Sequence, residues 1–405
     1  MKHIIFIFLT ILFLITPISL ADDNLLYEDL EPFTYTNPVS STDTSTVTYS
    51  KNICSLDRRT GLILYEKNSN EKVAIASTTK IMTCILALET LNFDKNPTYT
   101  ISKSAASATG SVLGLKYNKT ISLHDLLYGL MLRSGNDCAI LIAEIISGDL
   151  ENFSKLMNKK ASELGLKNTH FVTPHGLDSD EHYSTAYDLA ILTNYALKND
   201  IFKKIVSTKK ITIKLNEFYT EINNTNELLD IYPGIYGVKT GFTFNAGRCL
   251  VTAYKDDSFD IITVVLGADS KSIRSRDTKY VLKYIKENFK YINIETIITN
   301  SFSSYQNIIK NHLILNKTTS KPDFYLEKLS NYYFPIKLDG NQKFSTKLYI
   351  QPKFSFKQPS NTIVGKLSIF NEYNLYSSLN IYLNNSLSKN TWNYYFFNIL
   401  KNIKF

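Results

Sequence analysis

The sequence has few cysteines and almost no long hydrophobic runs. Its four cysteines, Cys54, Cys84, Cys138 and Cys249, stand far apart, and none belongs to a C-x-x-C pair or a Cys/His spacing typical of zinc sites. Their neighbours are mostly apolar, which favours buried thiols over a disulfide framework. Only one uninterrupted apolar stretch occurs, at the N-terminus, so a protein with several membrane spans is excluded.

The chain does contain enough apolar material for a sizeable core. Of its 405 residues, 44% are hydrophobic and 13% are aromatic, with 27 Tyr and 23 Phe. A disordered chain is poor in aromatic residues, so wholesale disorder is excluded. The length predicts two or three domains rather than one.

Acidic residues are scarce in the last quarter of the chain. Residues 301–405 contain 13 Lys against four Asp and Glu, a net charge of +9 in a chain whose total is +8. The positive charge therefore belongs to a C-terminal appendage. A Lys-rich segment can bind nucleic acid, but the N-terminus, which has the pattern of an export signal described in the next paragraph, argues against a nucleic-acid partner.

Residues 1–21 have the pattern of a secretory signal peptide. The positive start Met1-Lys2-His3 precedes the apolar run Ile4–Ile15, and small residues lead to a cleavage point near Ala21. The run is short for a spanning helix, although an uncleaved N-terminal anchor is the alternative. No cysteine follows the run, which argues against lipoprotein attachment. We therefore expect an exported protein.

The chain beyond the signal is predicted to hold a flexible linker, rich in Ser and Thr, at 22–50 and an α+β domain at 51–290. Hairpin strands surround a helical middle, which indicates an antiparallel sheet with helices on its faces. The expected strands are Asn52–Leu56, Leu62–Glu66, Tyr236–Thr240, Arg248–Tyr254 and Phe259–Leu266, and the expected helices are Ile81–Leu91, Ser122–Leu130, Asp137–Ile146, Thr185–Leu197 and Arg274–Asn288.

From about Asn300 short alternating strands are predicted, giving a small all-β domain at 300–385. Residues 390–405 then carry an apolar stripe at helical spacing, formed by Trp392, Tyr395, Phe396, Ile399, Leu400 and Ile403. Such a segment is too short to span a bilayer, so we expect an amphipathic helix lying on a membrane surface. A helix packed on the β-domain is the alternative.

Three short signatures carry the candidate chemistry: Ser77-Thr78-Thr79-Lys80, Ser134-Gly135-Asn136 and Lys239-Thr240-Gly241. The first two patterns also occur elsewhere in the chain, so each is weak alone. Their order and setting are informative, because Ser77 opens a buried helix, Ser134 lies between two helices, and Lys239 lies on a strand.

The first signature suits serine nucleophilic catalysis. Residues three apart share a helix face, so the Lys80 amine can reach the Ser77 hydroxyl. Lys80 accepts a proton only when neutral, and burial together with a second cation such as Lys239 lowers the pKa of a lysine. Lysine then takes the role that histidine has in other serine enzymes.

These residues resemble the serine D-alanyl-D-alanine carboxypeptidases, the low-molecular-mass penicillin-binding proteins. The resemblance covers about Lys51 to Phe289, and it implies a β-lactamase/transpeptidase-like fold and a site at the outer face of a bacterial cytoplasmic membrane. The matching strings, in family order, are ASTTKIMT, DLLYGLMLRSGNDCA, TPHGLDSDEHYSTAYDLA, NTNELL and YPGIYGVKTGFT.

The resemblance implies attack by Ser77 on the penultimate D-Ala of a peptidoglycan stem peptide, with Lys80 as base and without metal or cofactor. β-Lactams would acylate the same serine. The remaining implied roles are proton transfer by Ser134, binding of the substrate amide by Asn136, binding of the terminal carboxylate by Lys239 and Thr240, close approach at Gly241, and an oxyanion hole from the amides of Ser77 and Phe242.

Other functions and roles stay open at this point. A class A β-lactamase needs an E-x-x-L-N string, which is absent between Asn136 and Lys239. A catalytically silent wall-assembly protein and an endopeptidase acting on D-Ala cross-links are further alternatives. Arg248 would either assist the carboxylate or lie at the surface, and His170, His175 and His182 are expected to be structural.

Overall fold

The computed structural model describes residues 48–309 without a gap and several shorter segments on either side. These segments are 25–27, 33–35, 313–316, 318, 320–329, 332–338, 342–351, 353–355, 357–371 and 374–390. The predicted signal peptide and all but the first residue of the predicted C-terminal helix lie outside the described residues. The chain divides into two compact units, unit 2 with Val39–Tyr291 and Pro335–Asp339, and unit 1 with the remaining residues.

Unit 2 is built on a five-stranded antiparallel sheet in the order β4-β3-β11-β10-β9. The predicted strands are confirmed with small changes of boundary. They are β3 (Asn52–Asp57), β4 (Ile63–Lys67), β9 (Ile235–Thr243), β10 (Gly247–Lys255) and β11 (Asp260–Ala268). Strand β9, which carries the K-T-G signature, is an edge strand of this sheet.

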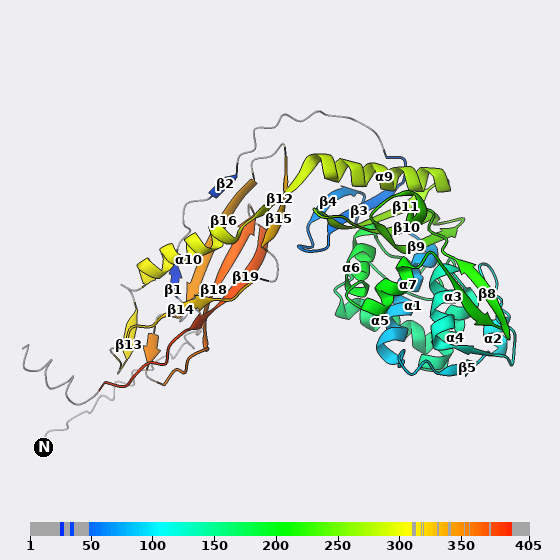
Figure 1. Ribbon diagram of the computed structural model, residues 1–405, viewed down its shortest axis with the longest axis horizontal. Coiled ribbons are helices and arrows are strands. Elements are labelled where there is room, and N and C mark those ends of the chain that lie inside the picture. The colour runs from blue at the N-terminus through cyan, green and yellow to red at the C-terminus, as the bar shows by residue number, and fades with distance from the viewer. Residues whose placement is uncertain are drawn as a thin grey trace, which may run out of the picture. The chain divides into compact units, whose positions relative to one another are not determined.

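Helices pack on both faces of the sheet, with α9 (Lys271–Asn288) on one face and α6 (Ala186–Ala196) on the other (Figure 1). The period-2 alternation of β11 explains this. Ile262, Val264 and Leu266 belong to the larger core, whereas Ile261 and Val265 pack in a second core with residues of α9. A strand that is buried on both faces has a nearly continuous run of apolar residues in its sequence, as β11 does.

The other helices of unit 2 lie mainly on the α6 side of the sheet, around the larger core. Two predicted N-caps are confirmed, because Ser122 Oγ and Thr185 Oγ1 accept N–H bonds from Asp125 and Asp188. The bounds are η1 (a 3-10 turn, Ala76–Thr79), α1 (Lys80–Thr90), α2 (Lys103–Ala106), α3 (Leu123–Leu132), α4 (Asn136–Ser147), α5 (Leu150–Glu163), α7 (Asp200–Ser207) and α8 (Leu228–Ile231).

Two small two-stranded sheets of unit 2 were not predicted. They pair β5 (Thr98–Thr100) with β6 (Thr120–Ser122), and β7 (Lys210–Leu215) with β8 (Phe218–Asn223). All four cysteines are buried free thiols, as predicted.

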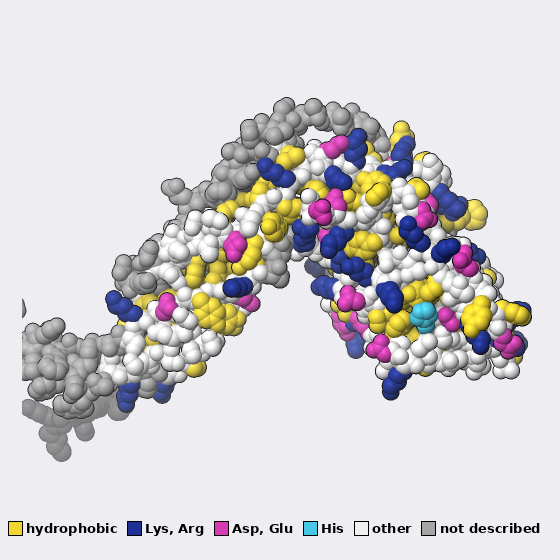
Figure 2. Space-filling view, viewed as in Figure 1, with side chains coloured by type: hydrophobic (Ala, Val, Ile, Leu, Met, Phe, Trp, Pro, Cys, Tyr) yellow, Lys and Arg dark blue, Asp and Glu magenta, His cyan; other side chains and the backbone are white. Residues whose placement is uncertain are grey.

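On the face of unit 2 seen in Figure 2, basic and acidic side chains are interspersed, so that face carries no field of one sign.

Unit 1 contains a six-stranded sheet in the order β1-β16-β18-β19-β14, with β2 also paired to β16. Helix α10 (Glu295–Ile309) packs on it, and its buried Tyr305 donates a hydrogen bond to the Thr346 carbonyl. Residues 300–309 are therefore helical, and the prediction of strands from Asn300 was wrong there because Ile298, Phe302 and Tyr305 follow a helical period.

The remaining strands lie in unit 1 or at its boundary. Strands β1 (Leu25–Tyr27) and β2 (Phe33–Tyr35) fall within the predicted linker, so these six residues belong to a sheet. No helix among the described residues is long and apolar enough to cross a membrane. The other bounds are β12 (Phe289–Asn293), β13 (Ile314–Asn316), β14 (Phe324–Leu326), β15 (Tyr333–Lys337), β16 (Gln342–Ile350), β17 (Lys353–Ser355), β18 (Ile363–Asn371) and β19 (Asn374–Leu383).

Candidate active site

The Ser77–Lys80 pair lies where η1 passes into α1. Ser77 is in the 3-10 turn and Lys80 is the first residue of the helix. The Lys80 Nζ atom lies 2.9 Å from Ser77 Oγ. A separation of three residues in this turn thus places the amine in contact with the hydroxyl, as the spacing predicted.

Lys80 is fully buried, and its amine has two further polar neighbours. Nζ lies 2.8 Å from Asn136 Oδ1 and 2.9 Å from the His175 carbonyl oxygen. The Asn136 amide is held in this orientation because its Nδ2 donates to the Thr109 carbonyl at 2.7 Å. A neutral amine has two N–H groups and one lone pair, so it can donate to both acceptors and accept the Ser77 proton.

The surroundings of Lys80 favour this neutral form. Burial, followed by the positive charge of Lys239, holds the pKa of Lys80 well below the usual range of an amine. An uncharged amine in contact with a serine hydroxyl is an arrangement that activates the serine as a nucleophile.

Backbone strain is concentrated beside the same residues. Ala76 has φ +48° and Ser134 has φ +63°, the left-handed region that side chains disfavour. Among the described non-glycine residues, only Glu217 and five asparagines, which tolerate this conformation, share it. Each such residue costs about 1–3 kcal/mol and persists only where its surroundings fix it. Ser134 makes no described hydrogen bond to Ser77 or Lys80.

Asp137 is a supporting residue that sequence reasoning missed. Its buried carboxylate accepts N–H bonds from Leu113, Gly114 and Leu115, at 2.9, 2.8 and 3.0 Å. It therefore fixes a distant loop against the start of α4, beside Asn136. An Asp in a first helical turn is ordinary in sequence, because it interacts favourably with the helix dipole, and nothing local points to the loop.

Lys239 is buried in β9, and its Nζ donates to the Thr240 carbonyl at 3.0 Å. Burial, together with the positive charge of Arg274, lowers the pKa of Lys239 to about 7. The Thr240 hydroxyl lies 2.7 Å from that of Thr225. The signature thus places the Lys239 amine, which changes its charge near pH 7, next in the chain to the Thr240 hydroxyl, which already contacts Thr225.

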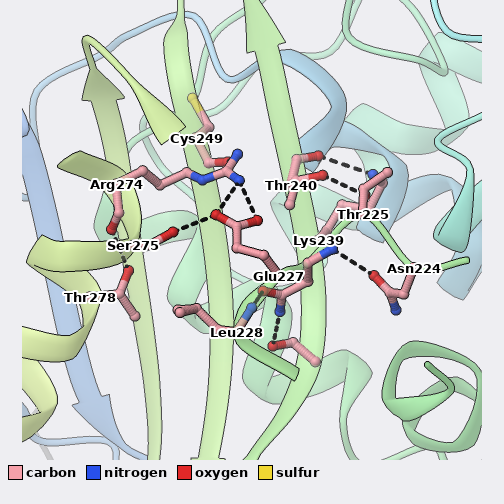
Figure 3. A network of polar contacts seen from close by, with 12 residues as sticks. Asn224, Thr225, Glu227, Leu228, Lys239, Thr240, Cys249, Arg274, Ser275 and Thr278 are labelled. Carbon is pink, nitrogen blue, oxygen red and sulfur yellow. Dashed lines mark hydrogen bonds and ion pairs between the residues drawn. The ribbon is translucent and has the colours of Figure 1, made fainter. Parts of the chain in front are cut away.

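Arg274 on α9 is held by an ion pair that the sequence did not reveal. Its guanidinium donates to both Glu227 carboxylate oxygens at 2.8 and 2.7 Å, and Ser275 Oγ donates to the same carboxylate (Figure 3). Arg274 also donates to the Cys249 carbonyl at 3.3 Å. These bonds fix the cation that lowers the pKa of Lys239. Glu227 and Arg274 are 47 residues apart in the sequence, so no local pattern indicates the pair.

Gly241 brings β9 close to the Ser77 turn. A Cβ atom at this position would lie 3.1 Å from the Ser77 amide nitrogen and 3.3 Å from the Ile75 carbonyl oxygen. The missing side chain thus allows the strand to approach the nucleophile's own turn. The next residue, Phe242, is 43% exposed, and the Arg248 guanidinium lies 3.6 Å from the centre of its ring.

The three histidines that were expected to be structural make different contacts. His175 provides its backbone carbonyl to Lys80. His182 Nε2 lies 2.8 Å from Thr79 Oγ1, and His170 Nδ1 contacts the Glu181 carbonyl. Among the described residues, no group of three or more His, Cys, Asp or Glu could hold a metal ion.

The structure brings most of the predicted site residues together. Ser77, Lys80 and Asn136 are linked by hydrogen bonds, and Gly241 lies against the Ser77 amide. Lys239 is close enough to lower the pKa of Lys80. Ser134, Thr240 and Phe242 are neighbours of these residues in the chain.

Comparisons with known proteins identify the family to which this chain belongs. The profile of the D-alanyl-D-alanine carboxypeptidase family matches residues 39–270, more than half of the chain. The chain is 41% identical over 241 residues to D-alanyl-D-alanine carboxypeptidase DacF of Bacillus subtilis, covering 58% of this chain and 61% of the relative. It is 36% identical over 239 residues to DacC of Escherichia coli, covering 56% and 59%.

Two solved structures are also similar. Penicillin binding protein 5 from Haemophilus influenzae is 27% identical with a TM-score of 0.67, over 85% of this chain and 99% of that one. The Streptomyces K15 DD-transpeptidase is 32% identical with a TM-score of 0.57, over 60% and 98%. The chain spans about three fifths of the length of the two curated relatives named above.

We predict that Gly176→Ala destabilises the protein far more than Gly148→Ala. Both glycines have the same left-handed backbone, with φ +86° and +82°. A Cβ at position 176 would lie 1.9 Å from the Ala76 carbonyl oxygen, whereas one at 148 would have no neighbour within 4 Å. Both variants lose about 1–2 kcal/mol from backbone strain, and Gly176→Ala loses about 1–3 kcal/mol more from overpacking.

Urea unfolding of the full chain measures both free energies. Gly148→Ala is the matched control, because it has the strained backbone without the clash. Equal losses for the two variants would contradict the close contact between the Ser77 turn and the loop of residues 170–184, named the His175 loop.

Proposed function

Because the chain belongs to the D-alanyl-D-alanine carboxypeptidase family, we propose that it removes the terminal D-Ala from peptidoglycan stem peptides through an acyl-enzyme on Ser77. The observation that carries this proposal is the fully buried Lys80 amine, 2.9 Å from Ser77 Oγ and between two carbonyl acceptors. Burial and the nearby charge of Lys239 lower the pKa of this amine and favour its neutral form, which is the form that can accept a proton.

Acylation follows from these contacts. The Ser77 oxygen attacks the carbonyl carbon of the penultimate D-Ala while its proton passes to Lys80. The negative charge that develops on the carbonyl oxygen is stabilised by the amide N–H groups of Ser77 and Phe242. The C–N bond then breaks, and Lys80 passes the proton it took from Ser77 to the departing D-Ala amine, with Ser134 assisting the transfer. In the second step a water molecule attacks the carbonyl carbon of the acyl-enzyme while its proton passes to Lys80. The ester bond to Ser77 then breaks, Ser77 regains a proton, and the shortened peptide is released.

The substrate would lie along the free edge of β9. An edge strand offers unpaired backbone N–H and C=O groups to an extended peptide, as in other peptide complexes. The terminal carboxylate would meet the Lys239 ammonium and the Thr240 hydroxyl. Asn136, which already contacts Lys80, would place its amide near the substrate backbone.

We predict that Ser77→Ala abolishes both covalent labelling by a fluorescent penicillin and release of D-Ala from a pentapeptide. β-Lactams present a reactive carbonyl and a carboxylate at positions like those of the peptide, so they would acylate the same oxygen. Gel fluorescence and mass spectrometry of the labelled tryptic peptide measure the first loss, and chromatography of D-Ala measures the second.

Ser207→Ala is the matched control, because Ser207 also begins an S-x-x-K pattern but lies at the end of α7. Labelling without D-Ala release would support a silent wall-assembly protein, and rapid release of hydrolysed penicillin would support a β-lactamase. Cleavage of cross-linked muropeptides in preference to pentapeptides would support an endopeptidase.

We predict that kcat/KM for a pentapeptide falls as the pH rises through about 7, because Lys239, whose pKa is lowered to about 7, loses its charge. The sign follows from the chemistry: a lysine is cationic below its pKa, and only the cation attracts the carboxylate. The pH profile of kcat/KM reports groups of the free enzyme.

Lys239→Arg should shift this fall to higher pH, since arginine stays protonated. A substrate whose terminal carboxylate is replaced by an amide is the control and should not show the fall in wild-type enzyme. A pentapeptide profile that is flat between pH 6 and 8 would contradict the role of Lys239.

Export and membrane attachment are part of the same proposal, supported by the sequence of residues 1–21 and 390–405. We predict that deletion of 390–405 lowers binding to anionic phospholipid vesicles, because the deletion removes an apolar stripe and its flanking lysines. Sedimentation with vesicles measures the binding, and unchanged penicillin labelling shows that the shortened chain is folded. Equal binding before and after deletion would contradict the anchor.

A further inference from the structure

A chain of three hydrogen-bonding groups runs from the His175 loop to the turn that holds Ser77. His182 is buried, and its Nε2 atom lies 2.8 Å from Thr79 Oγ1. Thr79 Oγ1 in turn lies 2.8 Å from the Ala76 carbonyl oxygen. The mechanism above uses none of these side chains.

The direction of each bond is fixed by chemistry. The Nδ1 atom of His182 faces the backbone N–H groups of Val172 and Thr173, at 3.0 and 3.3 Å, so it must be the unprotonated acceptor. The ring proton is then on Nε2, which donates to Thr79. The Ala76 carbonyl can only accept, so the single proton of the Thr79 hydroxyl donates to it.

This chain ends on the peptide group whose other side is the Ser77 amide. The Ala76 carbonyl and the Ser77 N–H belong to one rigid plane, so fixing the oxygen also fixes the direction of the N–H. Ala76 is in the disfavoured left-handed region, where the turn needs support from its surroundings.

We propose that His182 and Thr79 are positioning residues that orient the Ser77 amide as a donor to the developing oxyanion. The proposal rests on the acyl-enzyme function proposed above. Neither side chain needs to touch the substrate, because both act through the Ala76 carbonyl.

Other bonds hold the His175 loop in place without this chain. Thr83 Oγ1 donates to the Pro174 carbonyl at 2.6 Å, and Lys80 Nζ contacts the His175 carbonyl at 2.9 Å. The Phe171 N–H donates to Asn158 Oδ1 at 2.8 Å. Loss of the Thr79–His182 bond should therefore leave the loop and the environment of Lys80 in place.

The test compares two substitutions at each position. Thr79→Val removes the hydroxyl and keeps the shape, whereas Thr79→Ser keeps the hydroxyl. His182→Gln places an amide near the position of Nε2, where it can donate to Thr79. His182→Asn places an amide near the position of Nδ1, where it can only serve the Val172 and Thr173 amides.

Acylation and deacylation rates of the full-length chain are measured with a fluorescent penicillin. Removal of an oxyanion donor costs about 10²–10³ in rate, and a misdirected donor retains part of this. We expect Thr79→Val and His182→Asn to slow both steps by about 10-fold or more, because both steps pass through an oxyanion. Thr79→Ser and His182→Gln should restore most of the rate.

Three outcomes would overturn the proposal. The first is a wild-type rate in Thr79→Val, and the second is better rescue by His182→Asn than by His182→Gln, which would show that the histidine only supports the loop. The third is a shift in the pH dependence of acylation, which would show that the variants disturb Lys80 instead. Failure of the proposed function is distinguishable, because wild-type protein would then not be labelled at Ser77.

Discussion

The structure depends on the burial of one amine. Lys80 is removed from solvent, yet each of its polar neighbours comes from a different part of the chain: Ser77, Asn136 and the His175 carbonyl. A buried ammonium would be costly, and the second cation at Lys239 makes it costlier, so the neutral form is favoured. Three separate segments must therefore be in place before this residue can act as a base, and much of unit 2 serves to bring them together.

Support for these contacts is distributed widely. Asp137 holds the loop around Leu113, and the Glu227–Arg274 pair fixes the cation that acts on Lys239. Gly241 and Gly176 allow a strand and a loop to approach the Ser77 turn from different segments of the chain. The strained Ala76 lies directly against both glycines, and a strained residue persists only where its surroundings fix it. The chemistry is thus a property of the packing around the signatures as much as of the signatures themselves.

Much of unit 2 could be predicted from its sequence, because its strands and helices have clear apolar periods and its caps at Ser122 and Thr185 are local. The contact of Ser77 with Lys80 follows from helical spacing alone. Asp137 and Glu227 could not be found this way, since their partners lie 22 to 48 residues away. Helix α10 was missed although Ile298, Phe302 and Tyr305 follow a helical period, because polar residues make up much of the segment and weaken that signal.

The four unpaired cysteines have a consequence for how the polypeptide matures. Burial raises the pKa of Cys249 to about 11 and that of Cys54 to about 12. At pH 8 the thiolate, which is the reactive form of a cysteine, is therefore rare at Cys249. Once folded, the chain gains nothing from oxidant or reductant in its surroundings, and it needs no disulfide isomerase to reach its native state. Its fold rests on packing, hydrogen bonds and ion pairs, with no disulfide among the four cysteines.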